Sequence, residues 1–310
     1  NRNSVKAPLV ILPTLWFRNN WSWGYNQYKP TLSTNHRGQI DIEHKSLYMR
    51  KLYSRDKNVK ILFCENETNT EKLYGKKSEN KYFKDGINNH LLYKKHTVNP
   101  KKFGTKAAFV IDTEIEAGET KTFDFRLSPH KMENAFFDFD EVFENRKIEA
   151  NEFYENIQKD ITDEDEKNVQ RQAFAGLLWN KQFYHYKVGK WLKGDPNFPV
   201  ERNFENHVRN VEWKHMNCKD IISMPDKWEY PWFATWDLAF HCVSFSILDS
   251  EFAKNQLQLL TKEWYMHPNG QLPAYEWDFS DVNPPVHAWS TFRVFKIDEK
   301  IKGKPDLAFL

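Results

Sequence analysis

The sequence predicts a multidomain β + α protein in which an antiparallel β-sandwich precedes a helical domain. Before residue 130, short apolar runs alternate with turn residues at close spacing, as in antiparallel sheets. After residue 138, apolar residues recur with the 3.6-residue period of a helix. The charge also reverses, because residues 1–130 carry 23 Lys and Arg against 13 Asp and Glu, whereas residues 131–310 carry 22 against 30. We therefore expect a sandwich over 1–130, a linker helix over 131–160 and a helical domain over 161–310.

The strands of the sandwich are predicted from apolar runs bounded by turn residues, at 9–17, 46–53 and 59–64. Residues 108–113 alternate between the two faces of a strand, and Phe123, Phe125 and Leu127 share one face of another. The turn-forming residues 116–119 separate these two runs, which predicts a β-hairpin. We expect the sandwich to lack its first strands.

The helices of the second part are predicted from apolar spacing and from capping residues. A linker helix follows Asp138, and Thr162 with Asp165 resembles a capping box that opens a helix to about Tyr184. Three further helices are expected over 232–248, 251–264 and 284–295, opened by Pro231, by Ser250 as a cap and by the Pro284-Pro285 pair. Because no strand pattern intervenes, we expect an all-α second domain.

Composition places the chain among globular proteins and excludes several function classes. It has 310 residues, of which 40% are hydrophobic and 28% charged, and no run approaches the roughly 18 apolar residues of a spanning helix. The three cysteines, Cys64, Cys218 and Cys242, lack metal-ligand spacing. We expect no membrane association, no metal and a cytoplasmic location, although glycosylation-type triplets at Asn20 and Asn66 would suit a secreted protein.

The basic, tyrosine-rich first part could hold single-stranded nucleic acid through stacking and phosphate contacts. Its lysines, however, come singly or in pairs and form no dense stripe. A solvated face is the better interpretation, so no nucleic-acid partner is expected.

Aromatic, carboxylate and amide side chains are concentrated between residues 224 and 289. Seven of the 12 Trp lie between Trp213 and Trp289. A sugar ring offers apolar C–H faces that pack on indoles, and hydroxyl groups that need carboxylate and amide partners. Both rich stretches, 224–237 and 264–285, fall at helix N-termini or in the loops before them, so we expect them to converge on one sugar pocket.

Four stretches resemble the glucosidase-like proteins of glycoside hydrolase family 63, including those related to mannosylglycerate hydrolase. They are residues 12–24 (LPTLWFRNNWSWG), 224–233 (MPDKWEYPWF), 236–241 (WDLAFH) and 264–278 (WYMHPNGQLPAYEWD). The resemblance runs across nearly the whole chain. It implies an N-terminal β-sandwich followed by the first helices of an (α/α)6 toroid, and hydrolysis of α-glucosidic bonds with inversion and without a cofactor.

Inverting chemistry needs a carboxylic acid and a carboxylate base, about 6.5 to 9.5 Å apart, on opposite faces of the scissile bond. The resemblance implies that the acid follows Leu310 and the base comes later, since we expect the chain to be a truncated piece of a longer protein; the catalytic residues are therefore unassigned. If the acid is within the chain, Asp278 is the candidate, because Trp277 and Phe279 would desolvate it. The implied sugar-binding residues are Tyr230, Trp232, Trp236, Asp237, Tyr275, Glu276, Trp277, Asp278 and Asn283.

Simpler structural interpretations stand beside these assignments. Asp237 could merely complement a helix dipole, and His241, four residues later, is better explained as a satisfied core histidine than as a pocket residue. Trp16, Trp21 and Trp23 most simply pack the sandwich or its interface with the toroid, and a second sugar site there is the alternative.

The predicted function is hydrolysis of an oligosaccharide or glucoside substrate by the longer protein, with this chain inactive alone. The alternatives are a non-catalytic carbohydrate-binding or scaffold protein and a hydrolase of a neighbouring toroid family such as the trehalases. Sugar identity and oligomeric state are left open.

Overall fold

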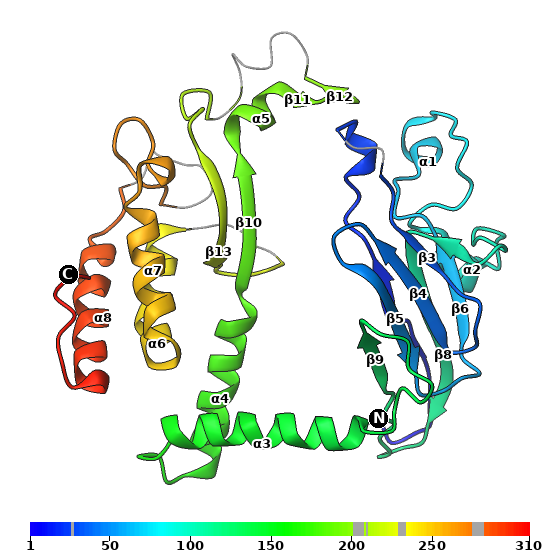
Figure 1. The fold of residues 1–310 in the computed structure, drawn as a ribbon, viewed down its shortest axis with the longest axis horizontal. Helices are drawn as coiled ribbons and strands as arrows, with labels where there is room; N and C mark the ends of the chain where they lie inside the picture. The colour runs from blue at the N-terminus through cyan, green and yellow to red at the C-terminus, as the bar shows by residue number, and fades with distance from the viewer. Residues whose placement is uncertain (26–27, 201–207, 209, 229–233, 275–281) are drawn as a thin grey trace. The chain divides into compact units, whose positions relative to one another are not determined.

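The computed structural model describes the chain except for residues 26–27, 201–207, 209, 229–233 and 275–281. The chain forms two compact units, Asn1–Asn145 and Arg146–Leu310. Antiparallel sheets dominate the first unit and helices the second, so the protein is a mixed α + β protein (Figure 1).

The first unit contains two antiparallel sheets. One has the strand order β7-β3-β4-β5-β9; in the other, β8 lies between β1 and β2 on one side and β6 on the other. The strands are β1 (Ala7–Ile11), β2 (Thr14–Trp16), β3 (Thr31–Ser33), β4 (Gln39–His44), β5 (Tyr48–Ser54), β6 (Lys60–Cys64), β7 (Phe103–Gly104), β8 (Lys106–Ile115) and β9 (Phe125–Ser128). Short helices η1 (Trp21–Trp23), α1 (Thr70–Tyr74) and α2 (Gly86–Tyr93) lie in the connections.

The two sheets share one buried core. Leu32, Ile40 and Ile42 come from the five-stranded sheet, and Phe63, Ala107 and Phe109 come from the other. Because all six side chains belong to one cluster, the sheets pack face to face. The predicted antiparallel sheets in this part of the chain are confirmed.

The predicted hairpin between residues 108–113 and 123–127 is wrong. The strand β9 pairs with β5 in the other sheet, where Leu127 lies opposite Leu52. The edges of β8 are taken by β1 and β2 on one side and by β6 on the other. The apolar alternation of β9 places Phe125 in the core, where the centroid of its ring lies 5.5 Å from that of Phe109.

The second unit is not all-α. It contains α4 (Glu164–Trp179), α5 (Val188–Lys193), α6 (Thr235–Leu248), α7 (Ser250–Leu260), η3 (Glu263–Tyr265) and α8 (Val286–Lys302), together with strands β10 (Lys181–Lys187), β11 (Gly194–Asp195), β12 (Phe198–Pro199) and β13 (Asn217–Ser223). The helix α3 (Phe139–Ile157) runs from the first unit into the second. The predicted linker helix after Asp138 is therefore present.

The strands β10 and β13 pair over seven residues, and this pair corrects the predicted all-α domain. The helix expected to reach Tyr184 ends at Trp179, and its N-cap is Asp163 rather than Thr162. In β10 the partly buried Tyr184 and Tyr186 alternate with exposed neighbours, which is the period of a strand. Aromatic residues favour such a half-buried pleated surface.

The helices α6, α7 and α8 pack against one another (Figure 1), and side chains of α6 and α7 hydrogen-bond to Ser223 of β13. The predicted end of α6 at Leu248 is confirmed, whereas α7 is capped by Asp249 instead of Ser250, and α8 extends to Lys302 instead of Phe295. One buried cluster, which includes Ile222, Leu238 and Leu257, joins these elements. None of the described helices combines the length and the apolar character that a membrane-spanning helix needs.

Candidate functional site

Three of the nine predicted sugar-binding residues lie in the part of the chain that the structure describes, namely Trp236, Asp237 and Asn283. The other six lie outside the described residues: Tyr230, Trp232, Tyr275, Glu276, Trp277 and Asp278. The candidate acid Asp278 is among these six. The site is therefore built from the residues that flank both stretches.

Trp236 and Asp237 lie in the first turn of α6. The preceding residue, Ala234, is extended, with φ −82° and ψ 123°, and no side chain caps this helix N-terminus. Leu238 and Ala239 are fully buried and fix the inner face of the helix. Trp236 is 38% exposed and Asp237 is half-buried, so an indole and a carboxylate stand together on the more open face.

A hydrogen-bonded contact ties α6 to the second stretch. The Thr235 hydroxyl donates to the Pro273 carbonyl oxygen at 2.9 Å, and the Thr235 amide approaches the same oxygen at 3.4 Å. Thr235 and Ala274 are both buried. The start of α6 is therefore fixed against the residues that directly precede segment 275–281.

Asn283 closes the other end of that segment. Its Nδ2 donates to the Leu272 carbonyl oxygen at 2.7 Å, whereas its buried Oδ1 has no hydrogen-bond partner among the described residues. Leu272 and Asn283 are thus in contact although they lie 11 positions apart in the sequence. Described residues of the two stretches meet at the Thr235–Pro273 contact.

A second polar contact lies one helical turn below Asp237. His241 Nδ1 and Ser223 Oγ are 2.8 Å apart, and the amide of Ser223, which is fully buried, donates to Gln256 Oε1 at 3.1 Å. His241 is partly buried and hydrogen-bonded, which agrees with the interpretation of a satisfied histidine. Neither Ser223 nor Gln256 was predicted, although Ser223 directly precedes the stretch that begins at Met224.

Burial shifts the pKa values of both titratable groups on this face of α6. It raises the pKa of Asp237, against the opposing effect of the nearby His241 charge. It lowers the pKa of His241, against the opposing effect of Asp237. A half-buried carboxylate beside an indole can accept hydrogen bonds from hydroxyl groups of a ligand.

Other residues of the matched stretches have structural roles. Tyr265 is fully buried, and its hydroxyl donates to Asp220 Oδ2 at 2.8 Å. Gly270, with φ +85°, lies in a turn in which the His267 amide donates to the Gln271 carbonyl oxygen at 2.8 Å. Within the described part of the chain, no three His, Cys, Asp or Glu side chains gather as a metal ion would require.

The tryptophans of the first unit do not lie inside the sandwich core. Trp16 is 56% exposed, and Trp21 Nε1 donates to Glu67 Oε1 at 2.8 Å. The Arg18 guanidinium lies 5.4 Å from the ring of Trp23. Of the two expected roles, packing of the sandwich or of its interface with the helical part, the exposure of Trp16 excludes burial within the sandwich core for that residue.

Comparison with known proteins gives one informative similarity. No family model matches the chain. A Saccharomyces cerevisiae protein described as uncharacterized protein YMR196W is 40% identical over 350 aligned residues. The alignment covers 100% of this chain but only 32% of the yeast protein, so the chain spans about a third of the length of the curated relative it matches. That relative's description names no activity.

Proposed function

We propose that the chain carries part of the sugar-binding pocket of a glycoside hydrolase that cleaves α-glucosidic bonds in short saccharides or glucosides with inversion. The pocket forms where the start of α6 meets the segment between Leu272 and Asn283. The observation that supports this proposal best is the hydrogen bond from Thr235 to Pro273, because it holds Trp236 and Asp237 at the flank of the second aromatic stretch.

The described residues would each bind one part of a sugar. The partly exposed indole of Trp236 packs on the apolar C–H face of a pyranose ring. The Asp237 carboxylate accepts hydrogen bonds from two neighbouring hydroxyl groups, and the Oδ1 of Asn283, which has no partner among the described residues, accepts another. Together they would orient a ring without reacting with it.

The reaction needs a protonated acid at the leaving oxygen and a carboxylate that activates water on the opposite face of the ring. No described residue is assigned to either role, and Asp278 remains the candidate acid within the chain. The first helices of an (α/α)6 toroid are part of the same proposal. Phe240, Trp289 and Phe292, on α6 and α8, are 50%, 49% and 51% exposed, which suits helices that pack against further helices.

Binding of saccharides by the full chain tests the pocket. Titration with maltose, trehalose and methyl α-glucoside, followed by NMR, should show binding that weakens by about tenfold or more in Trp236→Ala and Asp237→Asn. Trp16→Ala is the matched control, because it removes an exposed indole from the other unit. If only Trp16→Ala loses binding, the sugar site lies in the first unit and the proposal is rejected. Absence of binding to all three saccharides would also reject the proposal.

Turnover by the full-length protein tests the chemistry. Initial release of β-glucose from α-glucosides, observed by NMR, is expected from an inverting enzyme. Binding that depends on Asp237 without any turnover would instead identify a non-catalytic carbohydrate-binding or scaffold protein.

A further inference from the structure

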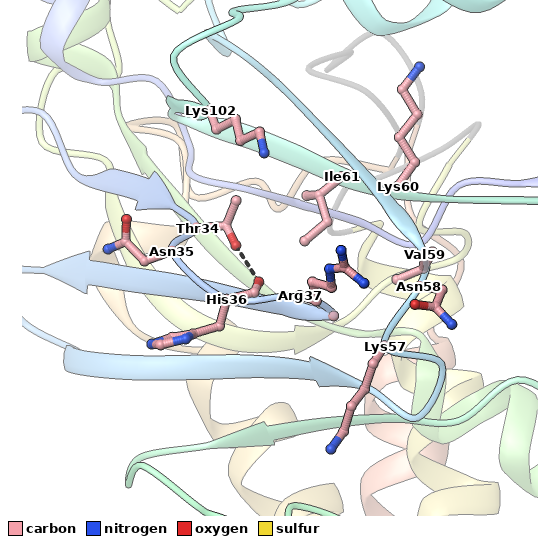
Figure 2. Close-up of a pocket in the computed structure, with 11 residues that line it drawn as sticks. Thr34, Asn35, His36, Arg37, Lys57, Asn58, Val59, Lys60, Ile61 and Lys102 are labelled. Carbon is pink, nitrogen blue, oxygen red and sulfur yellow. Dashed lines mark hydrogen bonds between the residues drawn. The ribbon is translucent and has the colours of Figure 1, made fainter.

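A cleft of about 470 Å³ opens in the first unit, among three of its loops (Figure 2). One loop joins β3 to β4, a second leads from β5 into β6, and a third precedes β7. A volume of this size lies within the range of small-molecule sites, about 300 to 1,000 Å³. Its lining consists of residues 34–38, residues 57–61 and Lys102.

The lining is strongly basic. It contains one arginine and three lysines and no Asp or Glu: Arg37, Lys57, Lys60 and Lys102. Among the described residues, none of the four forms a salt bridge with a carboxylate; Lys60 Nζ lies 3.4 Å from His90 Nε2. The adjacent Asp56 lies outside the lining, and its Oδ1 accepts a hydrogen bond from the Asn58 amide at 2.8 Å.

Close packing joins the two loops that carry Arg37 and Lys57. Gly38 has φ +65°, and a Cβ there would lie 2.8 Å from the Cα of Lys57. Only glycine allows this approach, because any side chain would both clash and be strained in the left-handed region. The Ser54 amide donates to the Gly38 carbonyl oxygen at 2.8 Å and fixes the contact.

The other side of the cleft is also held in place. Lys102 has φ +57°, and its amide donates to the Asn99 carbonyl oxygen at 3.1 Å. The Thr34 hydroxyl lies 2.8 Å from the His36 carbonyl oxygen and 2.7 Å from that of Gln39. Figure 2 shows the Arg37 and Lys102 head groups on either side of Ile61, while Lys57 and Lys60 extend in opposite directions.

Like charges held near one another repel, and a bound anion would relieve that repulsion. The planar guanidinium of Arg37 can bind two phosphate oxygens at once, and each lysine adds a point charge. The lining contains no Phe, Tyr or Trp, so it offers neither the stacking platforms of single-stranded nucleic-acid sites nor an indole for a neutral sugar. The volume exceeds that of a single phosphate group, since one water occupies only about 30 Å³ of liquid.

We propose that this cleft binds a small anion with more than one phosphate group, with Arg37 and Lys102 as its main contacts and Lys57 and Lys60 adding attraction from the rim. The site lies in the first unit and does not depend on the proposed sugar pocket.

Calorimetric titration of the full chain with inorganic tripolyphosphate and inositol hexakisphosphate tests this site. One saturable site is expected for at least one probe, with weaker binding of orthophosphate and a loss of affinity as salt rises. Preference for tripolyphosphate indicates a linear ligand, and preference for inositol hexakisphosphate a phosphorylated ring; either result supports the proposal.

The double variant Arg37→Glu/Lys102→Glu should bind about tenfold more weakly or worse. Lys45→Glu/Lys77→Glu is the matched control, because it changes the net charge equally at exposed positions outside the lining. Arg37→Gln/Lys102→Gln removes both charges without reversing them, and circular dichroism checks that each variant is folded. The proposal would be overturned if the cleft and control variants lost phosphate affinity equally. It would also be overturned if both cleft variants retained binding, or if the wild type did not bind. Tighter binding of a thymidine decanucleotide than of both phosphate probes at this cleft would also overturn it.

Discussion

The Thr235 hydroxyl donates a 2.9 Å hydrogen bond to the Pro273 carbonyl oxygen, 38 residues further along the chain. Thr235 is 2% exposed, so this contact is shielded from water. It joins the first turn of α6 to the segment that precedes residues 275–281. The contact therefore links stability to the geometry of the proposed sugar pocket.

Replacing Thr235 by Val keeps the shape of the side chain but removes its hydrogen bond to Pro273. We expect a loss of about 1 to 3 kcal/mol in the free energy of unfolding, because a buried acceptor loses its best donor. Hydrogen exchange should accelerate in peptides that contain residues 270–274. Thr261→Val is the control, since the Thr261 hydroxyl bonds to the Gln258 carbonyl oxygen at an exposed helix end. Similar losses in the two variants would contradict a special role for the Thr235 contact.

The pH dependence of stability should report the burial of His241. Its pKa is lowered by burial, so the unfolded chain takes up the proton first as the pH falls below about 6.5. The contribution of His241 is therefore unchanged above that pH and becomes destabilising below it. His241→Asn keeps an amide in place of the ring that contacts Ser223, and it should remove part of the fall in stability between about pH 7 and pH 5. Urea unfolding at each pH measures the free energy of unfolding of the wild type and the variant. An identical change in His96→Asn, at an exposed position, would contradict this assignment.

The effect of Asp237 on the pH dependence of stability should be opposite to that of His241. Because burial raises the pKa of Asp237, the folded state holds a proton at a pH where the unfolded state has lost it. At neutral pH the half-buried Asp237 charge destabilises the folded state, and this destabilisation is relieved as the pH falls through the folded pKa. We expect Asp237→Asn to match or exceed wild-type stability at pH 7 while it weakens saccharide binding. Unchanged binding together with raised stability would remove Asp237 from the proposed pocket.

Local pattern predicted much of this fold, and tertiary pairing accounts for the main errors. The alternation of β9 was visible in the sequence, but its partner was not, because the neighbours of β8 come from three distant strands. The sequence predicts a helix where β10 lies, because Leu177 and Leu178 continue a helical spacing almost to Lys181. The alternation of aromatic residues in β10 is explained by its pairing with β13.

In the candidate site, too, some features follow from the sequence and others depend on tertiary contacts. Motif resemblance selected Trp236 and Asp237, and the helix predicted over 232–248 contains both residues near its start. The contacts of Thr235 with Pro273 and of Ser223 with His241 join residues that are distant in the sequence. Such pairs cannot be predicted from sequence periodicity, because a single side-chain hydrogen bond produces no repeating pattern.

Two glycines with the same backbone conformation should differ in their tolerance of a side chain. Gly38 has φ +65° and Gly75 has φ +66°, but a Cβ at Gly38 would meet Lys57, whereas nothing lies within 4 Å of a Cβ at Gly75. Both Ala variants carry the left-handed strain, about 1 to 2 kcal/mol. Gly38→Ala should be destabilised further and should also weaken phosphate binding, because the loops must separate. Thermal unfolding compares the two variants, and equal transition temperatures would show that the loops adapt freely.

The ion pair between Lys254 and Asp298 should contribute strongly to the second unit. Lys254 is 3% exposed and Asp298 is fully buried, with 2.5 Å between Nζ and Oδ2; Lys254 Nζ also lies 2.7 Å from Asp306 Oδ2. Burial alone would raise the pKa of Asp298, but hydrogen bonds from Lys254 and Lys302 outweigh it and hold the value at about 2. This stabilisation is present above the ordinary pKa of about 3.8 and is lost as the pH falls toward 2.

Removal of one partner from this pair should cost more than removal of both. Lys254→Met leaves the buried Asp298 carboxylate without its buried lysine partner, although Lys302 stays beside it, so we expect a loss of about 3 to 5 kcal/mol at pH 7 that shrinks on acidification. Lys254→Met/Asp298→Leu removes both charges and should recover most of that loss. Lys296→Met, which breaks an exposed pair with Glu299, should cost about 1 kcal/mol or less. Urea unfolding measures all three variants, and a double variant no more stable than Lys254→Met would show that packing, rather than the unpaired charge, dominates the effect.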